Sequence, residues 1–358
     1  MPLINFLYAQ LARARRRYFQ QHPHLRRRLE APVISVGNLT VGGSGKTPLA
    51  GAIARMLVDQ GERPAILSRG YGRHRPADGV VVVSEGSGGA PRVHIDVAGD
   101  EPVMLARSVS EAAVLVSPDR YLAGKLAETR LARSIHILDD GFQHLGLSRD
   151  VDLLVTPPDD FFDMRTLPFG RFRESIEAAT AADALLVPIG QVRLKPDTTD
   201  AHQAPVEMDE KAEMARRLGV PVAFGFERSL GDARVRREPG EPGEIIAVGS
   251  ARVYAIAGIA RPDRFFQDLE RAGWQLAGRQ RFRDHHRYSS RDVQEIGRRA
   301  RQSGADVILM TEKDLVRWPV SPLLDVPVAS VPLRVVIEPG FQPWLIQRVI
   351  DARRRAVA

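Results

Sequence analysis

The sequence predicts an α/β fold: a mostly parallel, P-loop-like sheet with helices on both faces, together with a second, smaller α/β domain. Two observations lead to this prediction. Short β-rich runs alternate along the chain with segments of helical periodicity, which is the pattern of βαβ units. In addition, the first β-rich run, at residues 32–38, is followed by a glycine-rich loop and then by a helical segment.

The elements of the first domain are each expected from a short stretch of sequence. Further strands are predicted at 63–70, 79–86, 134–141, 151–156 and 183–189. Helices are predicted at 46–61, which ends at a glycine, and at 119–132. Because binding sites in parallel sheets lie beyond the carboxyl ends of the strands, the residues that follow these runs are the candidates for a site.

The composition of the chain changes after about Pro188. Residues 189–250 are rich in Pro, Gly, Asp and Glu and hold few apolar runs, which indicates a boundary with a connecting segment. A second α/β pattern follows, with strands expected at 252–260 and 306–314 and helices at 263–273 and 290–304. Residues 341–356 have the pattern of a closing amphipathic helix.

Composition excludes several classes of protein. The chain of 358 residues is 44% hydrophobic and 27% charged, as expected for a soluble, globular protein. It has no cysteine, so disulfides, thiolate metal sites and cysteine nucleophiles are excluded. No apolar run approaches the roughly 20 residues that span a bilayer. The N-terminus is not expected to be a secretory signal, because its apolar part precedes its arginines, and a cytoplasmic location is therefore the default expectation.

The net charge of +7 is concentrated at the N-terminus. Residues 1–30 hold seven arginines and one glutamate, which leaves only +1 for the rest of the chain, so we expect no nucleic-acid partner. An apolar stripe at helical spacing, Leu3, Phe6, Leu7 and Leu11, precedes the arginines. The pattern fits a helix at a membrane interface with guanidiniums on lipid phosphates, and equally an N-terminal helix packed on its own domain.

The loop after the first strand has the parts of a phosphate-binding loop. In such a loop glycines turn backbone N–H groups toward phosphates, a lysine reaches the β- and γ-phosphates, and the next hydroxyl binds magnesium. The usual pattern begins with glycine, whereas this chain has threonine at that position. The predicted nucleotide-binding residues are Thr40, Val41, Gly42, Gly43, Ser44, Gly45, Lys46 and Thr47.

A phosphate loop needs a carboxylate for the magnesium, usually from the end of a nearby strand. Asp139 and Asp140 follow the apolar run at 134–138, and Gly141 allows the chain to turn away. Together with Thr47 they are the predicted metal ligands. Either aspartate could contact the ion, directly or through water.

Two further loops are unusually polar. Asp100 and Glu101 lie between a glycine and a proline at the expected start of a helix, where they could also be simple helix caps. Asp284, His285 and His286 lie together in the second domain, where a plain surface loop is the alternative. No other spacing suggests a metal site, so a zinc site is not expected.

These stretches together resemble a known family. In order along residues 32 to 340 they are GNLTVGGSGKTP, SRGYGR, GDEPVMLA, SPDRYLAG, ILDDGFQH, LPFGRFRES, AGIARPDRFF, DHHRYS and TEKDLVRW. The set resembles the tetraacyldisaccharide 4′-kinases, the lipid A 4′-kinases of Gram-negative bacteria. In that family the first glycine of the loop is commonly replaced, in agreement with Thr40. LPFGRFRES departs from the family's LPAGPLRE-like stretch, and residues 191–205 look like an insertion.

The resemblance implies a domain arrangement. Two α/β domains would be joined by a two-stranded antiparallel linker, with the nucleotide in the cleft between them. We accordingly expect a basic amphipathic, membrane-associating segment over 1–30 and the P-loop kinase domain over 31–225. Linker strands and the smaller lid domain are expected over 226–338, and a C-terminal helix over 339–358.

The resemblance also implies a reaction. ATP, with Mg²⁺, would phosphorylate the 4′-hydroxyl of tetraacyldisaccharide 1-phosphate to give lipid IVA, at the cytoplasmic face of the inner membrane and with the enzyme bound peripherally. The family's base and its partner histidine correspond to Asp100 and His285. Lys46 and an arginine would stabilise the transferred charge, and Arg120 and Arg173 are the candidates.

Two alternatives belong to other classes. A P-loop GTPase or metallochaperone would use the nucleotide as a switch, but guanine readers carry N/T-K-x-D, and Glu312 stands where that lysine should be. A membrane- or DNA-partitioning ATPase would have no use for the DHH loop. An acceptor-dependent release of ADP distinguishes the kinase from both.

Overall fold

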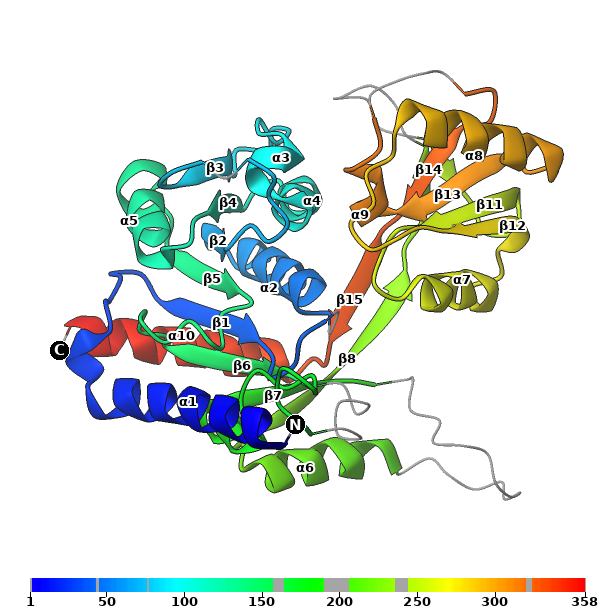
Figure 1. Ribbon diagram of the computed structural model, residues 1–358. Helices are drawn as coiled ribbons and strands as arrows, with labels where there is room; N and C mark the ends of the chain where they lie inside the picture. Colours follow the sequence, from blue (N-terminus) through cyan, green and yellow to red (C-terminus); the bar gives the residue numbers. More distant parts are fainter. Residues whose placement is uncertain are drawn as a thin grey trace.

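The computed structural model describes residues 2–42, 45–75, 77–156, 164–189, 206–235, 244–319 and 324–357. Two sheets organise the chain, and Figure 1 shows them as two separate α/β layers. Gly43 and Ser44 of the predicted nucleotide loop lie outside the described residues, as does the predicted insertion at 191–205.

The first sheet has nine strands in the order β15-β8-β7-β6-β1-β5-β2-β4-β3. From β8 to β4 all neighbours are parallel, and the two edge strands, β15 and β3, are antiparallel. The strands are β1 (Val33–Gly37), β2 (Pro64–Ser68), β3 (Val81–Ser84), β4 (Ala113–Val116), β5 (Ile135–Asp139), β6 (Val151–Val155), β7 (Ala184–Pro188), β8 (Ala223–Leu230) and β15 (Leu333–Ile337).

Helices cover both faces of this sheet because its strands are apolar on both sides. Residues such as Ile34 and Val36 of β1 face a core shared with α2 (Lys46–Asp59), α4 (Asp100–Ser108) and α10 (Phe341–Val357). The opposite face packs against α5 (Arg120–Leu131), the 3₁₀ turn η3 (Ile176–Ala181) and α6 (Val206–Leu218). A short helix, α3 (Ile95–Ala98), precedes α4.

The second sheet has six strands in the order β10-β9-β14-β13-β11-β12. Its strands are β9 (Ala233–Val235), β10 (Ile245–Ile246), β11 (Arg252–Ala257), β12 (Gln275–Arg281), β13 (Val307–Thr311) and β14 (Val328–Val331). One face packs on α7 (Pro262–Arg271) and the other on α8 (Ser290–Gln302), and α9 (Glu312–Leu315) follows β13. The predicted fold class is confirmed.

Two antiparallel strands connect the sheets. β8 and β15 pair from Phe226 opposite Ile337 to Leu230 opposite Leu333, and Figure 1 shows them running side by side between the two layers. The segment 189–250, whose composition indicated only a connection, contains α6 and β8, and both of them pack into the first unit. The composition misled here because α6 is rich in charged residues.

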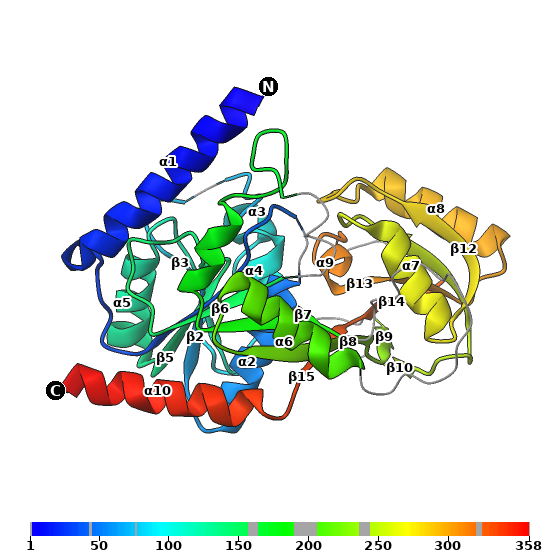
Figure 2. The same cartoon turned by 90° about the horizontal axis from the view of Figure 1, so that it is seen from below.

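The N-terminal helix α1 (Pro2–Gln21) runs along the outside of the first domain, and η1 (Pro23–Leu25) follows it (Figure 2). None of the described helices is long and apolar enough to cross a membrane. The apolar stripe of α1 points outward: Leu3, Ile4, Phe6, Leu7, Leu11 and Tyr18 are all more than half exposed.

The arginines of the N-terminal segment bind the protein itself. Arg16 is buried, forms a bidentate ion pair with Glu174 at 2.6 and 2.8 Å, and lies over the ring of Phe142. Partners within the protein are found for Arg13, Arg15, Arg16, Arg26, Arg27 and Arg28. These contacts agree with the alternative that the helix packs on its own domain, and Arg16 in particular is buried in its ion pair with Glu174. Contact of the exposed arginines with lipid phosphates stays a prediction.

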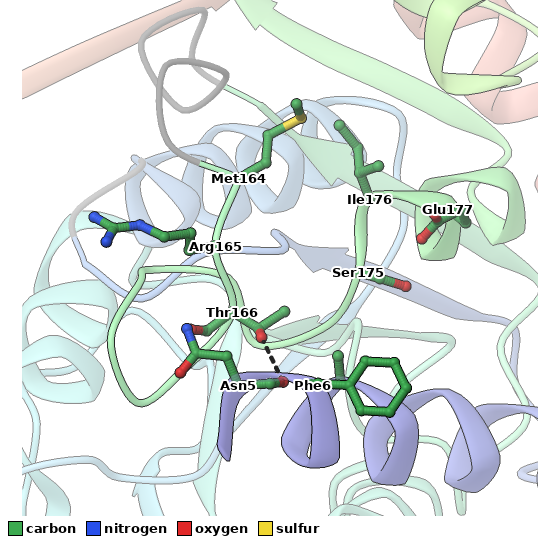
Figure 3. A pocket seen from close by; sticks show the side chains of 9 residues that line it. Asn5, Phe6, Met164, Arg165, Thr166, Ser175, Ile176 and Glu177 are labelled. Atoms are coloured by element: carbon green, nitrogen blue, oxygen red, sulfur yellow. Dashed lines mark hydrogen bonds between the residues drawn. The ribbon is translucent and has the colours of Figure 1, made fainter. Parts of the chain in front are cut away.

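A cavity of about 350 Å³ lies between α1 and the segment 164–177, and residues of both line it. Two hydrogen bonds hold the helix beside it: Asn5 Nδ2 donates to the Thr166 carbonyl, and Thr166 Oγ1 donates to the Asn5 carbonyl. Figure 3 shows Asn5 and Thr166 facing each other at the edge of the cavity. α1 is thus attached through a few polar contacts, while its apolar stripe has no cover in the described part of the chain.

Candidate active site

The phosphate loop connects β1 to α2 at the carboxyl edge of the first sheet. Gly45 precedes the helix with φ 87°, a left-handed conformation that favours glycine. Lys46, the first residue of α2, is buried, and its Nζ donates to Asn38 Oδ1 at 2.9 Å and lies 3.6 Å from Asp140 Oδ1. Burial lowers the pKa of Lys46. A second anion beside this ammonium would be strongly favoured, as in a phosphate site.

The entry to the loop pairs with Arg171 and Phe172, in the segment that precedes η3. Thr40 forms a β-bridge with Phe172, and Val41 N donates to the Arg171 carbonyl at 2.8 Å. Asn38 Nδ2 donates to Thr40 Oγ1 at 3.0 Å. Threonine at the first position of the loop therefore has a structural use, since its hydroxyl orients the asparagine that binds Lys46.

Two carboxylates lie beside the Thr47 hydroxyl, and the charge of a third, Asp140, also acts on Asp139. Thr47 Oγ1 lies 3.3 Å from Asp139 Oδ1 and 3.4 Å from Glu101 Oε2. Burial, with smaller contributions from the charges of Glu101 and Asp140, raises the pKa of Asp139 to about 7. The arrangement concentrates negative charge in a buried place, which a cation would relieve.

This donor set fits Mg²⁺. Hydroxyl and carboxylate oxygens are the ligands that magnesium prefers, usually together with substrate phosphates. In the described part of the chain no group of three or more His, Cys, Asp and Glu side chains could hold a metal by itself. Thr47 and the two aspartates would therefore hold the ion jointly with a bound nucleotide.

The two candidate arginines approach the same carboxylates. Arg173 Nη1 donates to Asp140 Oδ2 at 2.7 Å and to Gln143 Oε1 at 3.2 Å. Arg120 opens α5, is only 4% exposed, and its Nε has no hydrogen-bond partner among the described residues. Burial lowers the pKa of Arg120 to about 10. Although burial alone would raise it, the charges of Lys46 and Arg173 hold the pKa of Asp140 below its usual range.

The carboxylate of Asp100 meets a histidine of the other domain. Asp100 is the first residue of α4 and is 6% exposed. His285 Nδ1 lies 2.9 Å from Asp100 Oδ2, and because a carboxylate only accepts, Nδ1 is the donor. Burial alone would raise the pKa of Asp100, but the hydrogen bond from His285 and the charge of Lys313 hold it below its usual value.

The backbone around this pair is unusual on both sides. Gly99 has φ 92°, and a Cβ there would lie 2.8 Å from the Tyr71 carbonyl, so the turn that presents Asp100 requires glycine. His285 itself has φ 59°, and Asp140 has φ 55°. Non-glycine residues in this region cost of order 1–3 kcal/mol and cluster at functional sites. Two of the three such residues in the described chain belong to this site.

The structure distinguishes the residues of the DHH loop. His286 turns away from Asp100: its Nε2 lies 3.2 Å from Asp292 Oδ2, and its ring stacks on Phe282. Asp284 accepts from the His285 backbone N–H at 3.0 Å. Only His285 contacts Asp100, which the sequence pattern alone could not select.

Sequence reasoning missed three residues of the site. Asn38 accepts hydrogen bonds from both Lys46 and Arg173, and its place directly after β1 could have identified it. Lys313 donates to Glu101 Oε1 at 3.1 Å, and Arg317 Nε lies 3.5 Å from Asp100 Oδ2. Both come from the TEKDLVRW stretch of the second domain, which carries no motif of known chemistry.

Comparisons with known proteins decide the family. The sequence profile described as "Tetraacyldisaccharide-1-P 4'-kinase" matches residues 1–350. The chain belongs to this kinase family. The family predicted from the sequence is thereby confirmed.

Relatives of this kinase family match most of the chain. The tetraacyldisaccharide 4'-kinase of Desulfotalea psychrophila is 34% identical over 338 residues, which cover 93% of this chain and 90% of the relative. That of Koribacter versatilis is 37% identical over 295 residues, which cover 81% and 79%. Among solved structures, LpxK from Aquifex aeolicus in complex with ATP superposes with a TM-score of 0.72 at 29% identity, covering 97% of both chains.

The crowding of carboxylates in this kinase site gives a test on the nucleotide-free protein. At a pH above the raised pKa of about 7, replacing Asp139 by asparagine removes a buried charge beside two others and should raise Tm by about 2 °C, equivalent to about 1 kcal/mol. Thermal unfolding without nucleotide or magnesium measures this. The control is Asp150→Asn, which should lower Tm, because Asp150 accepts from Arg28 and from the Val33 N–H. A lower Tm for Asp139→Asn would refute the inferred repulsion.

Proposed function

We propose that this protein transfers the γ-phosphoryl group of ATP to the 4′-hydroxyl of a tetraacylated glucosamine disaccharide 1-phosphate. The observation that carries the proposal is the contact between Asp100 and His285, which joins the two domains beside the phosphate loop. Membership in the kinase family and the match to an ATP complex of LpxK support the nucleotide and the acceptor.

Asp100 acts as the general base. A sugar hydroxyl has a high pKa, so it must lose its proton as it attacks, and a carboxylate within hydrogen-bond reach can take that proton. Asp100 is buried yet held ionised by His285 and its cationic neighbours, so it is available to accept. His285 orients the carboxylate and stabilises the charge that changes there.

The charge that develops on the transferred group needs positive partners. Lys46 and Arg173 already converge on Asp140 and Asn38 and stand ready for phosphate oxygens. Arg120 adds a buried guanidinium whose Nε has no hydrogen-bond partner among the residues that the structure describes. Mg²⁺, held by Thr47 with Asp139 or Asp140 and the nucleotide, would supply further positive charge beside the phosphates.

The geometry gives less support to the alternatives. The TEKD stretch begins with Thr311, whose hydroxyl caps α9 by accepting from Asp314 N. It ends with Asp314, whose carboxylate already accepts from Gly258 N and from the Tyr288 hydroxyl. These contacts occupy the threonine and the aspartate that a guanine reader would need, and its lysine is replaced by Glu312. Release of ADP from ATP should depend on the lipid acceptor, and equal release with or without acceptor would instead favour a switch or partitioning ATPase.

The protein works at the cytoplasmic face of the inner membrane, where ATP and a lipid acceptor meet, and α1 attaches it there. Each exposed leucine of α1 that inserts contributes about 1.5–3 kcal/mol. Because most of the N-terminal arginines have partners within the protein, the apolar stripe carries most of the attachment. Binding should therefore be peripheral and only weakly reduced by salt.

Substituting Leu7 and Leu11 together by serine should abolish most co-sedimentation with anionic phospholipid vesicles. It should also raise the KM for acceptor in vesicles far more than the KM for ATP. These point changes are cleaner than deleting residues 2–19, which would leave Glu174 buried without Arg16. Val336→Ser, on an exposed position of β15, is the control. Unchanged sedimentation of the leucine variant would contradict attachment through α1.

A further inference from the structure

Arg317 of the second domain reaches the candidate base of the first. It follows α9 in the TEKDLVRW stretch, its side chain is 2% exposed, and its Nε lies 3.5 Å from Asp100 Oδ2. In the function proposed above this guanidinium contributes only its charge beside Asp100. An arginine this deeply buried is rare unless its charge is paired, so Arg317 is not a surface charge that faces a carboxylate by chance.

Arg317 is held by backbone and side-chain acceptors on its own domain. Nη1 donates to the Gly258 carbonyl at 2.9 Å and to the His286 carbonyl at 3.3 Å. Nη2 donates to Asp314 Oδ1 at 3.1 Å, and Nε donates to the Lys313 carbonyl at 2.9 Å. All three nitrogens are engaged, so the planar guanidinium has one orientation.

Asp314, the anchor of this arginine, is itself fully buried and satisfied. Its carboxylate accepts from Gly258 N at 2.9 Å, from the Tyr288 hydroxyl at 2.9 Å and from Thr311 Oγ1 at 2.6 Å. A buried network in which every member is paired is rigid and specifies one arrangement. Arg317 is therefore presented to Asp100 by a stiff support.

The same guanidinium also holds the loop that carries His285. It binds the carbonyl of His286, the next residue, and the carbonyl of Gly258, which accepts from His285 N at 3.2 Å as well. The left-handed backbone of His285 needs such support to persist. Arg317 thus lies beside the carboxylate of Asp100 and binds the two carbonyls, of Gly258 and His286, that support the backbone of His285.

We propose that Arg317 is a positioning residue that holds Asp100 and the His285 loop in register across the two domains. It acts through this pair and does not touch the substrate. The proposal rests on the function proposed above. It also explains why arginine is needed: Lys313 already places an ammonium 4.0 Å from Asp100 Oδ2, so charge alone is available without Arg317. A lysine could not replace Arg317, because one ammonium cannot form the hydrogen bonds that the three guanidinium nitrogens make in different directions.

The test compares Arg317→Lys with the wild type in single-turnover phosphoryl transfer to acceptor in detergent micelles. The rate should fall roughly 10- to 100-fold, with the KM for ATP changed less than about twofold, because positioning errors of an ångström have effects of this order. Arg353→Lys is the matched control: it breaks a two-pronged bond to Glu62 far from the pair and should leave the rate unchanged. Equal losses in the two variants would overturn the proposal.

A second comparison separates positioning from stability. In an Asp100→Asn background the Arg317→Lys change should lower the residual rate by less than about twofold, because its effect acts through Asp100. An undiminished further loss there would mean a general structural role. If Arg317→Lys does not fold, the double variant Arg317→Gln with Asp314→Asn replaces it in both rate comparisons. This double variant removes both charges of the pair and so leaves neither one buried without a partner. A wild type that transfers no phosphate would instead refute the proposed function.

Discussion

Replacing Lys46 by alanine is expected to lower turnover by at least about three orders of magnitude while the protein stays folded. The loss is large because Lys46 is buried at the start of α2, from where the lysine of a phosphate loop reaches the β- and γ-phosphates. The fold should survive because Asp140, which loses one cation, keeps Arg173 at 2.7 Å.

The measurement is the steady-state rate with saturating ATP, accompanied by a thermal unfolding curve. Lys125→Ala is the control, since Lys125 also pairs with two carboxylates, Glu30 and Glu128, but lies on α5 away from the loop. It should keep its activity. A folded Lys46→Ala protein with near-normal phosphoryl transfer would rule out the role given to the loop.

The second large effect concerns the pair that spans the domains. Asp100→Ala and His285→Ala should each lower the single-turnover rate by about 10²- to 10⁴-fold, the usual range for a general base. The double variant should lose little more, because groups that act as a unit are not additive. The physical reason is the single contact at 2.9 Å, through which His285 acts only by way of Asp100.

His286→Ala provides the neighbouring control. Its ring faces Asp292 and Phe282, so the change should cost stability and leave the rate within about threefold of wild type. Additive losses in the Asp100 and His285 double variant would show that the two residues work independently. A strong effect of His286→Ala on the rate would show that the wrong histidine has been assigned.

The parts of the fold that depend on neighbouring residues could be predicted from the sequence. Periodicity and short-range spacing predict the alternation of strands and helices, the glycine before Lys46 and the two aspartates at the end of β5. The structure contains each of them. The helix that begins at Asp100 was likewise expected from its glycine and proline neighbours. In these places sequence pattern and tertiary structure agree because neighbouring residues decide both.

Contacts between remote segments left no such signal. Asp100 and His285 are 185 residues apart, and only the resemblance to a family connected them. Nothing local distinguishes Arg317 from the other arginines of the chain, and its use depends on Asp314 and on the position of α4. For the same reason the sequence pattern of α1 could not decide between a membrane helix and a helix packed on its own domain: the partner of Arg16 is Glu174, which no helical pattern reveals.

The measurement that tests the account most directly is the position of the phosphate in the product. Wild-type protein, ATP with Mg²⁺ and tetraacyldisaccharide 1-phosphate in micelles should give a bisphosphate whose new group is on the 4′ oxygen, as read by two-dimensional ³¹P–¹H NMR. An acceptor that lacks the 4′-hydroxyl should give no product and no ADP above background. Phosphate on another oxygen, or ADP release that ignores the acceptor, would contradict the account.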